Sequence, residues 1–181
     1  MNRSFFIKGL AINILVIGAI AAICAFKPKE HKVPKAKKEG IQWISFEELI
    51  KESKKNKRKV VVDVYTDWCG YCKKMDANTF SNPKVAEYVN KKYYAVKLDA
   101  ESNKTFEYKG KQITERELAG QIFRVTGYPT TIYLDENLEI LSPVSGYLEV
   151  PIFEKILKFY GEDYYKKQSW PDFEASYKPV F

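Results

Sequence analysis

The order of strand and helix signals predicts an α/β domain in which helices flank a mixed central sheet. A strand–helix–strand succession between residues 59 and 99 is followed by a helix–strand–strand–helix succession between residues 114 and 160. The 181 residues leave room for one ordinary domain with a buried core, plus appendages. Hydrophobic residues make up 45% of the chain and aromatic residues 15%, which favours a globular protein over a disordered one.

Residues 1–26 are predicted to be a signal peptide or a membrane anchor. A short basic start precedes an uncharged run over residues 9–26, and a helix of about 18 residues rises about 27 Å, enough to cross a bilayer core. The alanines near the end of this run equally fit the cleavage site of a secretion signal, so both alternatives stay open. Cys24 follows Ile23, whereas an acylated lipoprotein cysteine normally follows a small residue, so a plain hydrophobic-segment cysteine is favoured.

Residues 27–40 are predicted to be a basic linker, because prolines and like charges replace any apolar periodicity there. Its lysines exceed the positive charge before the hydrophobic run, and positive flanks tend to stay cytoplasmic. We nevertheless expect a domain on the periplasmic side of the cell envelope, membrane-anchored or secreted, because the basic start and alanine-rich end are typical of a secretion signal. His31, the one histidine, lies in this linker.

The net charge of +7 is concentrated in the first 40 residues, which carry +6 of it, and residues 41–181 are almost balanced at +1. A lysine cluster between Lys51 and Lys59 is matched by acidic residues elsewhere in the domain. A nucleic-acid groove needs cations concentrated on a folded surface, with base-reading or aromatic residues among them. We therefore expect no nucleic-acid partner, and membrane contact only through residues 9–26 if they are uncleaved.

The domain is predicted over residues 41–160 and opens with alternating helix and strand signals. Ser45 and Glu48 form a capping-box pattern, and Pro83 after Asn82 suits the first position of a helix. The β-branched run after residue 58 predicts a central strand. The expected elements are a helix over about 46–56, a strand over 59–66, a helix over about 70–78, a helix from Pro83 and a strand over 93–99.

The second half of the chain begins with a polar stretch, residues 100–112, which predicts a surface insertion. Thr114 and Glu117 form a second capping box. The expected elements are a helix from there to about 125, strands over 130–135 and 139–142, and a helix over 151–160. The extension over residues 161–181 is predicted to pack on the domain, because it is rich in aromatic residues (Tyr164, Tyr165, Trp170, Phe173, Tyr177 and Phe181).

Cys69 and Cys72 stand where the central strand ends and a helix begins. A thiol is nucleophilic as a thiolate, and the start of a helix favours that anion. Cys69 is therefore expected to be the exposed attacking cysteine, and Cys72, inside the first turn, the more buried resolving thiol. Gly70 leaves the turn between them uncrowded.

Two other uses of these cysteines are disfavoured. A tetrahedral zinc site needs four ligands, and only Cys24 and His31 stand beside the pair as candidates. A purely structural disulfide gains little from closing so small a loop, and three cysteines are too few for a disulfide framework. We expect no metal and no organic cofactor, with the Cys69–Cys72 disulfide as the redox group.

Over about residues 41–160 the chain resembles the thioredoxin superfamily. Three separated motifs carry the resemblance: Trp68-Cys69-Gly70-Tyr71-Cys72, Asp63 six residues before the attacking cysteine, and Gly127-Tyr128-Pro129-Thr130. Gly146, before the last helix, fits the same pattern. Each motif alone is weak, but their order and spacing together are specific.

The resemblance implies a role for Asp63, which would lie buried beneath the disulfide and assist deprotonation of Cys72. Burial would raise the pKa of this carboxyl toward that of a general base near neutrality. Lys97 on the neighbouring strand is expected to be its partner. The alternatives are an ordinary polar residue on a half-exposed face for Asp63 and a surface lysine for Lys97.

The resemblance also implies a cis peptide bond before Pro129 and a substrate groove beside it. The backbone of this loop would pair with an extended client segment, as a form of strand addition. An ordinary turn proline and core aromatic residues are the alternatives. The residues expected to bind substrate are Trp68, Gly70, Tyr71, Tyr128 and Thr130.

The chain departs from thioredoxins proper at Tyr71 and Ala77, where that family has prolines, and at the enlarged connection 100–112. The stretch over residues 73–80, which runs into Asn82 and Pro83, is closer to bacterial envelope thioredoxin-like domains, including the soluble domains of transmembrane disulfide reductases. The expected function is a protein-disulfide reductase that acts on disulfide-bonded clients. An upstream dithiol partner would reduce its Cys69–Cys72 disulfide again. A disulfide isomerase or oxidase, and a non-catalytic binding protein with the same fold, are the alternatives.

Overall fold

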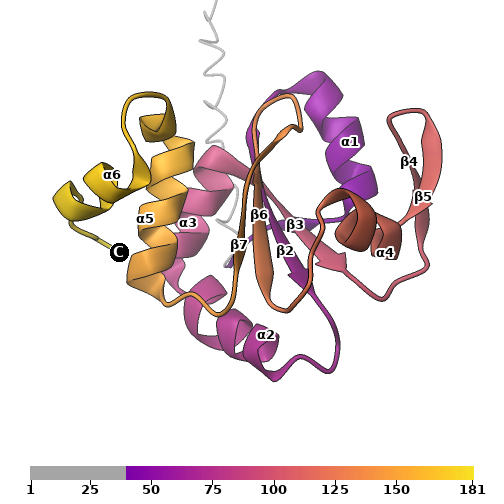
Figure 1. Cartoon of the computed structure of the whole chain (residues 1–181), viewed down its shortest axis with the longest axis horizontal. Coiled ribbons are helices and arrows are strands. Elements are labelled where there is room, and N and C mark those ends of the chain that lie inside the picture. The colour runs from indigo at the N-terminus through magenta and orange to yellow at the C-terminus, as the bar shows by residue number, and fades with distance from the viewer. Residues whose placement is uncertain (1–39) are drawn as a thin grey trace, which may run out of the picture. The chain divides into compact units, whose positions relative to one another are not determined.

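A five-stranded mixed sheet runs through the middle of the domain (Figure 1). The computed structural model describes residues 40–181, so the expectations for residues 1–26, Cys24 and His31 lie outside the described residues. The strand order is β1 (Trp43–Ile44), β3 (Tyr93–Asp99), β2 (Lys59–Tyr65), β6 (Thr130–Leu134) and β7 (Ile140–Ser145). The first three are parallel, whereas β6 and β7 run antiparallel to their neighbours. The mixed sheet predicted from the sequence is confirmed.

Strand β2 lies at the centre of this sheet, between β3 and β6, and six of its seven residues are buried. Its side chains alternate between the two faces. Val60, Val62 and Val64 face one hydrophobic cluster, and Val61 faces the other. Asp63 has the same parity as Val61 and therefore lies on the same face as that residue.

The helices divide between the two faces of the sheet (Figure 1). α1 (Phe46–Lys55) and the short α4 (Glu115–Glu117), which continues as the π-helical stretch η2 (Leu118–Ile122), pack on the face of Val60. α2 (Gly70–Met75), α3 (Pro83–Lys92) and α5 (Val150–Gly161) pack on the opposite face. Both expected capping boxes are present, at Ser45 with Glu48 and at Thr114 with Glu117.

Several element boundaries differ from those expected from the sequence, and the helix expected to reach about residue 125 ends at Ile122. The helix expected over about 70–78 extends to residue 80, because α2 continues as the π-helical stretch η1 (Asp76–Phe80). The last strand runs to Ser145 instead of ending near residue 142, although it contains Pro143. Proline has no backbone N–H to donate to a neighbouring strand. Because β7 is an edge strand with no neighbour on its open side, Pro143 is tolerated there.

The prediction of a polar surface insertion over residues 100–112 is wrong in part. This stretch builds a two-stranded hairpin, β4 (Thr105–Tyr108) and β5 (Lys111–Thr114), and Phe106 and Tyr108 are buried. Both rings pack against Phe46 of α1, at centroid distances of 5.4 and 5.8 Å. Strand alternation explains the difference, since every second residue of β4 points to the core while the polar ones face solvent.

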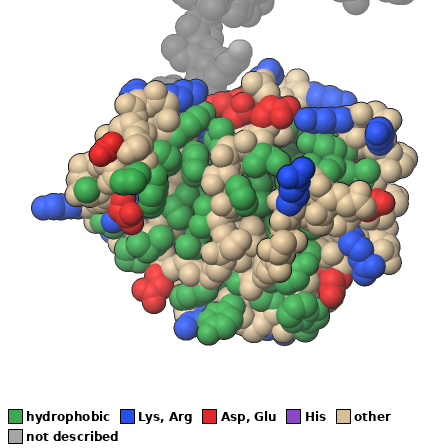
Figure 2. Space-filling model, in the orientation of Figure 1, with side chains coloured by type: hydrophobic (Ala, Val, Ile, Leu, Met, Phe, Trp, Pro, Cys, Tyr) green, Lys and Arg blue, Asp and Glu red, His purple; other side chains and the backbone are tan. Residues whose placement is uncertain are grey.

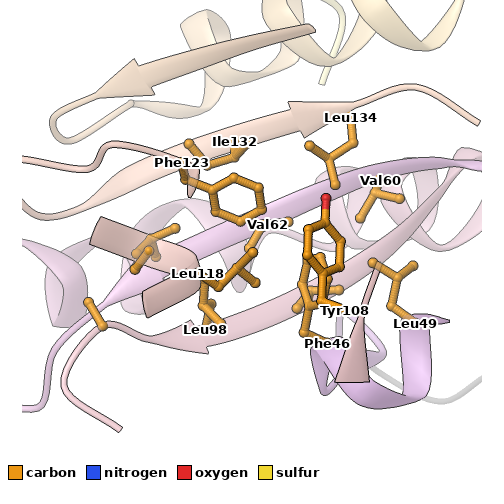
Figure 3. Packing of buried hydrophobic residues seen from close by; sticks show 14 of the residues in the cluster. Phe46, Leu49, Val60, Val62, Leu98, Tyr108, Leu118, Phe123, Ile132 and Leu134 are labelled. Carbon is orange, nitrogen blue, oxygen red and sulfur yellow. The ribbon is translucent and has the colours of Figure 1, made fainter. Parts of the chain in front are cut away.

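The core on this face joins sheet, helix and hairpin in one cluster. Figure 3 shows the labelled residues converging from different elements: Phe46 and Leu49 of α1, Val60 and Val62 of β2, Leu98 of β3, Tyr108 of the hairpin, Leu118 of η2, Phe123, and Ile132 and Leu134 of β6. Chain segments that are far apart in the sequence therefore share one core.

The segment after α5 packs on that helix. It forms the short 3₁₀ turn η3 (Tyr164–Lys166) and helix α6 (Trp170–Ser176). Phe173 is buried, with its ring 5.2 Å from that of Phe159. Glu154 of α5 is also buried and accepts hydrogen bonds from the Tyr177 hydroxyl and from the backbone N–H groups of Val180 and Phe181. No helix within residues 40–181 has the length and apolar character needed to cross a membrane.

Candidate functional site

Cys69 and Cys72 form a disulfide at the start of α2, shortly after the end of β2, with their Cα atoms 5.3 Å apart. Cys69 is the N-cap residue of α2, and its sulfur accepts the backbone N–H of Cys72 at 3.0 Å. The N–H of Cys69 itself donates to the carbonyl of Thr66 at 3.1 Å. A cap sulfur that accepts a helix N–H is the arrangement that also stabilises a thiolate at this atom.

The expected contrast in exposure between the two cysteines is almost absent. Cys69 is 4% exposed and Cys72 is 3% exposed, so the expectation of an exposed attacking cysteine is wrong for this disulfide form. The two sulfurs are bonded to each other, and each hides part of the other's surface. Around Gly70 there is open space, because a Cβ added there would meet nothing within 4 Å.

Cys72 faces the same side of the sheet as Asp63. Met75 follows Cys72 by one helical turn and therefore lies on the same face of α2. Met75 packs in the cluster that contains Val61, which shares a face of β2 with Asp63. The α2 side chains directed at the sheet thus point to the face that carries the buried carboxylate.

Asp63 is buried in the middle of the sheet, and one of its two oxygens is paired. Its Oδ2 accepts a hydrogen bond from the Lys97 ammonium at 2.6 Å, and the two residues are register partners on β2 and β3. Its Oδ1 is buried without a hydrogen-bond partner. Burial raises the pKa of the Asp63 carboxyl, and Lys97 offsets only part of that rise. The expected buried carboxylate and its lysine partner are both present.

Lys97 bridges two carboxylates, since its ammonium also bonds Asp76 at the start of η1. The same ammonium lies over the rings of Trp43, at 4.9 Å, and Phe80, at 5.2 Å. Burial by itself lowers the pKa of Lys97, but the two carboxylates outweigh that effect and the pKa is raised. Lys97 therefore stays charged beside Asp63. Asp76 was not predicted from the sequence as a site residue, because only the fold brings η1 to β3.

The loop before β6 has the cis peptide bond between Tyr128 and Pro129 that the resemblance implied. The Thr130 hydroxyl donates to the carbonyl of Gly127 at 2.7 Å, and the N–H of Gly146 donates to the carbonyl of Pro129 at 2.8 Å. Gly146 has a φ of +98°, a conformation that favours glycine. Within residues 40–181 the backbone N–H and C=O of Tyr128 have no hydrogen-bond partner.

Exposed aromatic side chains flank the disulfide. Trp68 is 66% exposed and Tyr71 is 63% exposed, which rules out core positions for both. Trp68 meets Tyr128 edge to face at 5.8 Å, and Tyr71 lies 6.4 Å from Tyr147. Figure 2 shows separate hydrophobic patches at the lower edge of the domain, near the place of α2 in Figure 1, besides those over the rest of this face.

We call the side chains around the disulfide, Trp68, Tyr71, Tyr128, Tyr147 and Lys74, the aromatic rim. Lys74 and Tyr147 were not predicted from the sequence as site residues. The Lys74 ammonium lies 4.8 Å from the centre of the Tyr147 ring and 6.0 Å from that of Tyr71. The spacing of Tyr71 and Lys74 by three residues in one helix was a usable signal. Tyr147 follows Gly146 directly, but nothing local in the sequence places it opposite α2.

No group of three or more His, Cys, Asp and Glu side chains suited to a metal ion occurs in residues 40–181. The expectation that no metal or organic cofactor takes part stays a prediction. The groups with chemistry at this site are the disulfide, the buried carboxylate with its lysine, and the unpaired backbone of the cis-proline loop.

Comparisons with known proteins agree with this geometry. A family model described as a thioredoxin-like domain matches residues 46–161. The thiol:disulfide interchange protein DsbD of Campylobacter jejuni is 25% identical over 145 residues, which cover 78% of this chain and 24% of that protein. DsbD of Haemophilus influenzae is 33% identical over 101 residues, which cover 54% of this chain and 16% of that protein. The chain thus spans about a quarter or less of these relatives.

A solved thioredoxin-fold protein from Helicobacter pylori superposes with a TM-score of 0.59. The two are 20% identical, and the match covers 66% of this chain and 80% of the other. At this identity the likeness concerns the fold alone.

Proposed function

The chain belongs to the thioredoxin-like domain family, within the thioredoxin superfamily of thiol:disulfide oxidoreductases, and from this premise we propose that it is a protein-disulfide reductase of the cell envelope. One observation carries the proposal. The Cys69–Cys72 disulfide caps α2 on the side of the sheet where Asp63 is buried.

The reaction runs through a mixed disulfide. In the reduced protein, the Cys69 thiolate attacks one sulfur of a client disulfide, and the other client sulfur leaves as a thiolate. Asp63 accepts the proton of Cys72, whose thiolate then attacks the Cys69 sulfur. The Cys69–Cys72 disulfide closes and the second client sulfur leaves, so the client gains two electrons. An upstream dithiol partner returns the pair to its reduced form.

The client is held as an extended segment beside Pro129. The unpaired N–H and C=O of Tyr128 supply main-chain hydrogen bonds, as in strand addition. Trp68 and Tyr71 offer apolar surface on both sides of the disulfide. Gly70 leaves room for the client sulfur to approach, and Thr130 fixes the loop through its bond to Gly127.

The envelope location rests on the basic start and hydrophobic run of residues 1–26, together with the similarity to thiol:disulfide interchange proteins. Those relatives are far longer than the matched region, which makes up 24% and 16% of them. We propose disulfide-bonded envelope proteins as clients and a membrane or envelope dithiol protein as the electron donor.

The reduction potential of the Cys69–Cys72 pair tests the direction of electron flow. Equilibration in a thiol/disulfide buffer, read by alkylation and mass, is expected to give a value near that of thioredoxin, about −270 mV. A value between about −180 and −120 mV would instead assign the protein to the isomerases or oxidases.

The exposed aromatic rim also favours a second candidate, a binding protein that holds clients without redox chemistry. The two are separated by the variant Cys69→Ser, with Cys72→Ser as its counterpart. We predict that Cys69→Ser abolishes turnover, because no attacking thiolate is left. Cys72→Ser should instead accumulate the mixed disulfide with the client, visible on a non-reducing gel. Full turnover in Cys69→Ser would contradict the reductase.

A further inference from the structure

Two buried polar atoms without partners stand opposite each other in the sheet. Asp63 on β2 and Thr131 on β6 are register partners in an antiparallel pair, so their side chains project from the same face. The structure places both residues at 1% exposure or less. Asp63 Oδ1 and Thr131 Oγ1 both lack a hydrogen-bond partner.

Leaving such atoms unpaired is unfavourable in a protein interior, above all for a carboxylate that must carry charge. Directly opposed residues have Cβ atoms about 4.5–5.5 Å apart, a gap that a hydroxyl and a carboxylate can close by side-chain rotation or through one water. Lys97, on the neighbouring strand β3, donates to the other oxygen of this carboxylate, Oδ2. Oδ1 therefore needs a donor from the β6 side.

We propose that Thr131 is a positioning residue for the proton acceptor of the reaction. Its hydroxyl donates a hydrogen bond to Asp63 Oδ1 when the carboxylate is charged, directly or through one water. This inference rests on the proposed function only in its consequence, which is that Thr131 sets the pH above which Asp63 can take the proton of Cys72. The hydrogen bond between Thr131 and Asp63 itself can be tested in the oxidised protein, without any redox reaction.

The other groups that face Asp63 do not replace this donor. Lys97 of β3 is already bonded to Oδ2, and Asp76 of η1 is an acceptor whose charge opposes ionisation of Asp63. In the oxidised protein the Cys72 sulfur is bonded to Cys69 and has no proton to donate. Tyr133, two residues after Thr131 on the same face, pairs in register with Val61, and its ring stacks on Tyr160. Burial raises the pKa of Asp63, and a hydrogen-bond donor to the charged carboxylate would lower it again.

The test is the pKa of Asp63 in the full-length oxidised protein, followed by carboxyl NMR. Thr131→Val removes the hydroxyl at nearly constant shape and is expected to raise the Asp63 pKa by about one to two units, as for loss of one hydrogen bond to a charged group. Thr131→Ser keeps the hydroxyl and should titrate like wild type. If Thr131→Val does not fold, Thr131→Ala takes its place, because it only removes atoms.

Tyr133→Phe is the matched control. It deletes another buried, unpartnered hydroxyl from the same face of the same strand, and it should leave the Asp63 pKa where it is. An unchanged pKa in Thr131→Val, or an equal shift in Tyr133→Phe, overturns the proposal.

A second readout links the pKa to the reaction. The pH profile of mixed-disulfide resolution should move upward in Thr131→Val by the same amount, which lowers the rate about tenfold per unit at pH values below the pKa. A profile that stays in place while the Asp63 pKa moves overturns the link to Cys72. Failure of wild type to turn over a client disulfide would refute the proposed function, and the NMR titration would still decide the role of Thr131.

Discussion

At the scale of single residues, the candidate site contains one carboxylate buried in the central strand. Asp63 has lysine on one side and threonine on the other, and its ionised form is disfavoured by burial. Such a group is kept at a cost in stability, as is common where a residue must exchange protons. The four side chains that surround the chemistry, Asp63, Lys97, Asp76 and Thr131, come from four separate elements.

The stability cost of Asp63 has a defined dependence on pH. Its pKa is higher in the folded protein than the ordinary value of 3.8, so the folded state binds this proton more tightly than the unfolded chain. The charged carboxylate therefore destabilises the fold as pH rises above 3.8, fully so above the raised pKa.

We predict that Asp63→Asn raises the free energy of unfolding at pH 8, by about 1.4 kcal/mol for each pKa unit between the folded and unfolded states. The gain should vanish below pH 3.8, where both states are protonated. Urea unfolding at several pH values measures it. Asp67→Asn, at an exposed position nearby, is the control and should show no such trend. A loss of stability in Asp63→Asn at pH 8 contradicts the prediction.

At the scale of elements, the stretch over residues 100–112 and the segment after Gly161, which was predicted to pack on the domain, both belong to the packed structure. The hairpin β4–β5 closes one core by inserting Phe106 and Tyr108 against α1. The segment after Gly161 is tied to α5 by Glu154 and by the aromatic contacts of Phe173. Neither part contributes a residue to the site, but both cover helices that pack on the sheet.

The hairpin is expected to contribute to global stability. We predict that Phe106→Ala lowers the free energy of unfolding by about 3–5 kcal/mol, because a buried ring is lost from a close-packed cluster. Chemical denaturation measures the change. Thr105→Ala, at the exposed neighbouring position of the same strand, should change stability by less than about 0.5 kcal/mol. Equal effects from the two variants would mean that the hairpin ring is not part of the core.

Glu154 is the buried acceptor that ties the end of the segment after Gly161 to α5. Glu154→Ala leaves the N–H groups of Val180 and Phe181 without their acceptor, and we predict a loss of about 2–3 kcal/mol together with release of the tail. Hydrogen exchange should then accelerate at residues 177–181. Tyr177→Phe removes one of the donors and should have a smaller effect. Unchanged exchange in Glu154→Ala would show that aromatic packing alone holds the tail.

At the scale of the whole domain, one ion-pair cluster joins three distant parts of the chain. Lys59 at the start of β2 is buried and pairs with Glu136, in the turn after β6, and with Asp163, after α5. Burial alone would raise the pKa of both carboxyls, but the hydrogen bonds to lysine outweigh it and both pKa values are lowered. For Asp163, the hydrogen bond from Lys166 lowers the pKa most, followed by the hydrogen bond from Lys59.

Lowered folded-state pKa values give the opposite pH dependence from that of Asp63. The stabilisation is complete above the ordinary values, 4.5 and 3.8, and is lost as pH falls through the folded values. We predict that Lys59→Met lowers the free energy of unfolding at pH 7 by about 1–3 kcal/mol and flattens the loss of stability in acid. Lys57→Met, at an exposed position, is the control. A variant with undiminished acid sensitivity would contradict this.

The sequence by itself determined the local features of this protein. Cys69 and Cys72 at a strand-to-helix junction, both capping boxes, the central strand and the motif around Pro129 each depend on residues within a turn or two of one another. Short-range geometry of this kind is set by backbone preferences and spacing, so it could be predicted from the printed residues. The roles assigned to those residues came from the resemblance of three motifs.

Tertiary structure alone decided which side chains meet. Register across β2, β3 and β6 set Lys97 and Thr131 on either side of Asp63, and the course of η1 brought Asp76 to the same lysine. Burial of Phe106 in a polar stretch depended on which face of a hairpin reached α1. A one-residue shift in strand pairing would move each of these side chains to the other face, and no local signal in the sequence fixes that register.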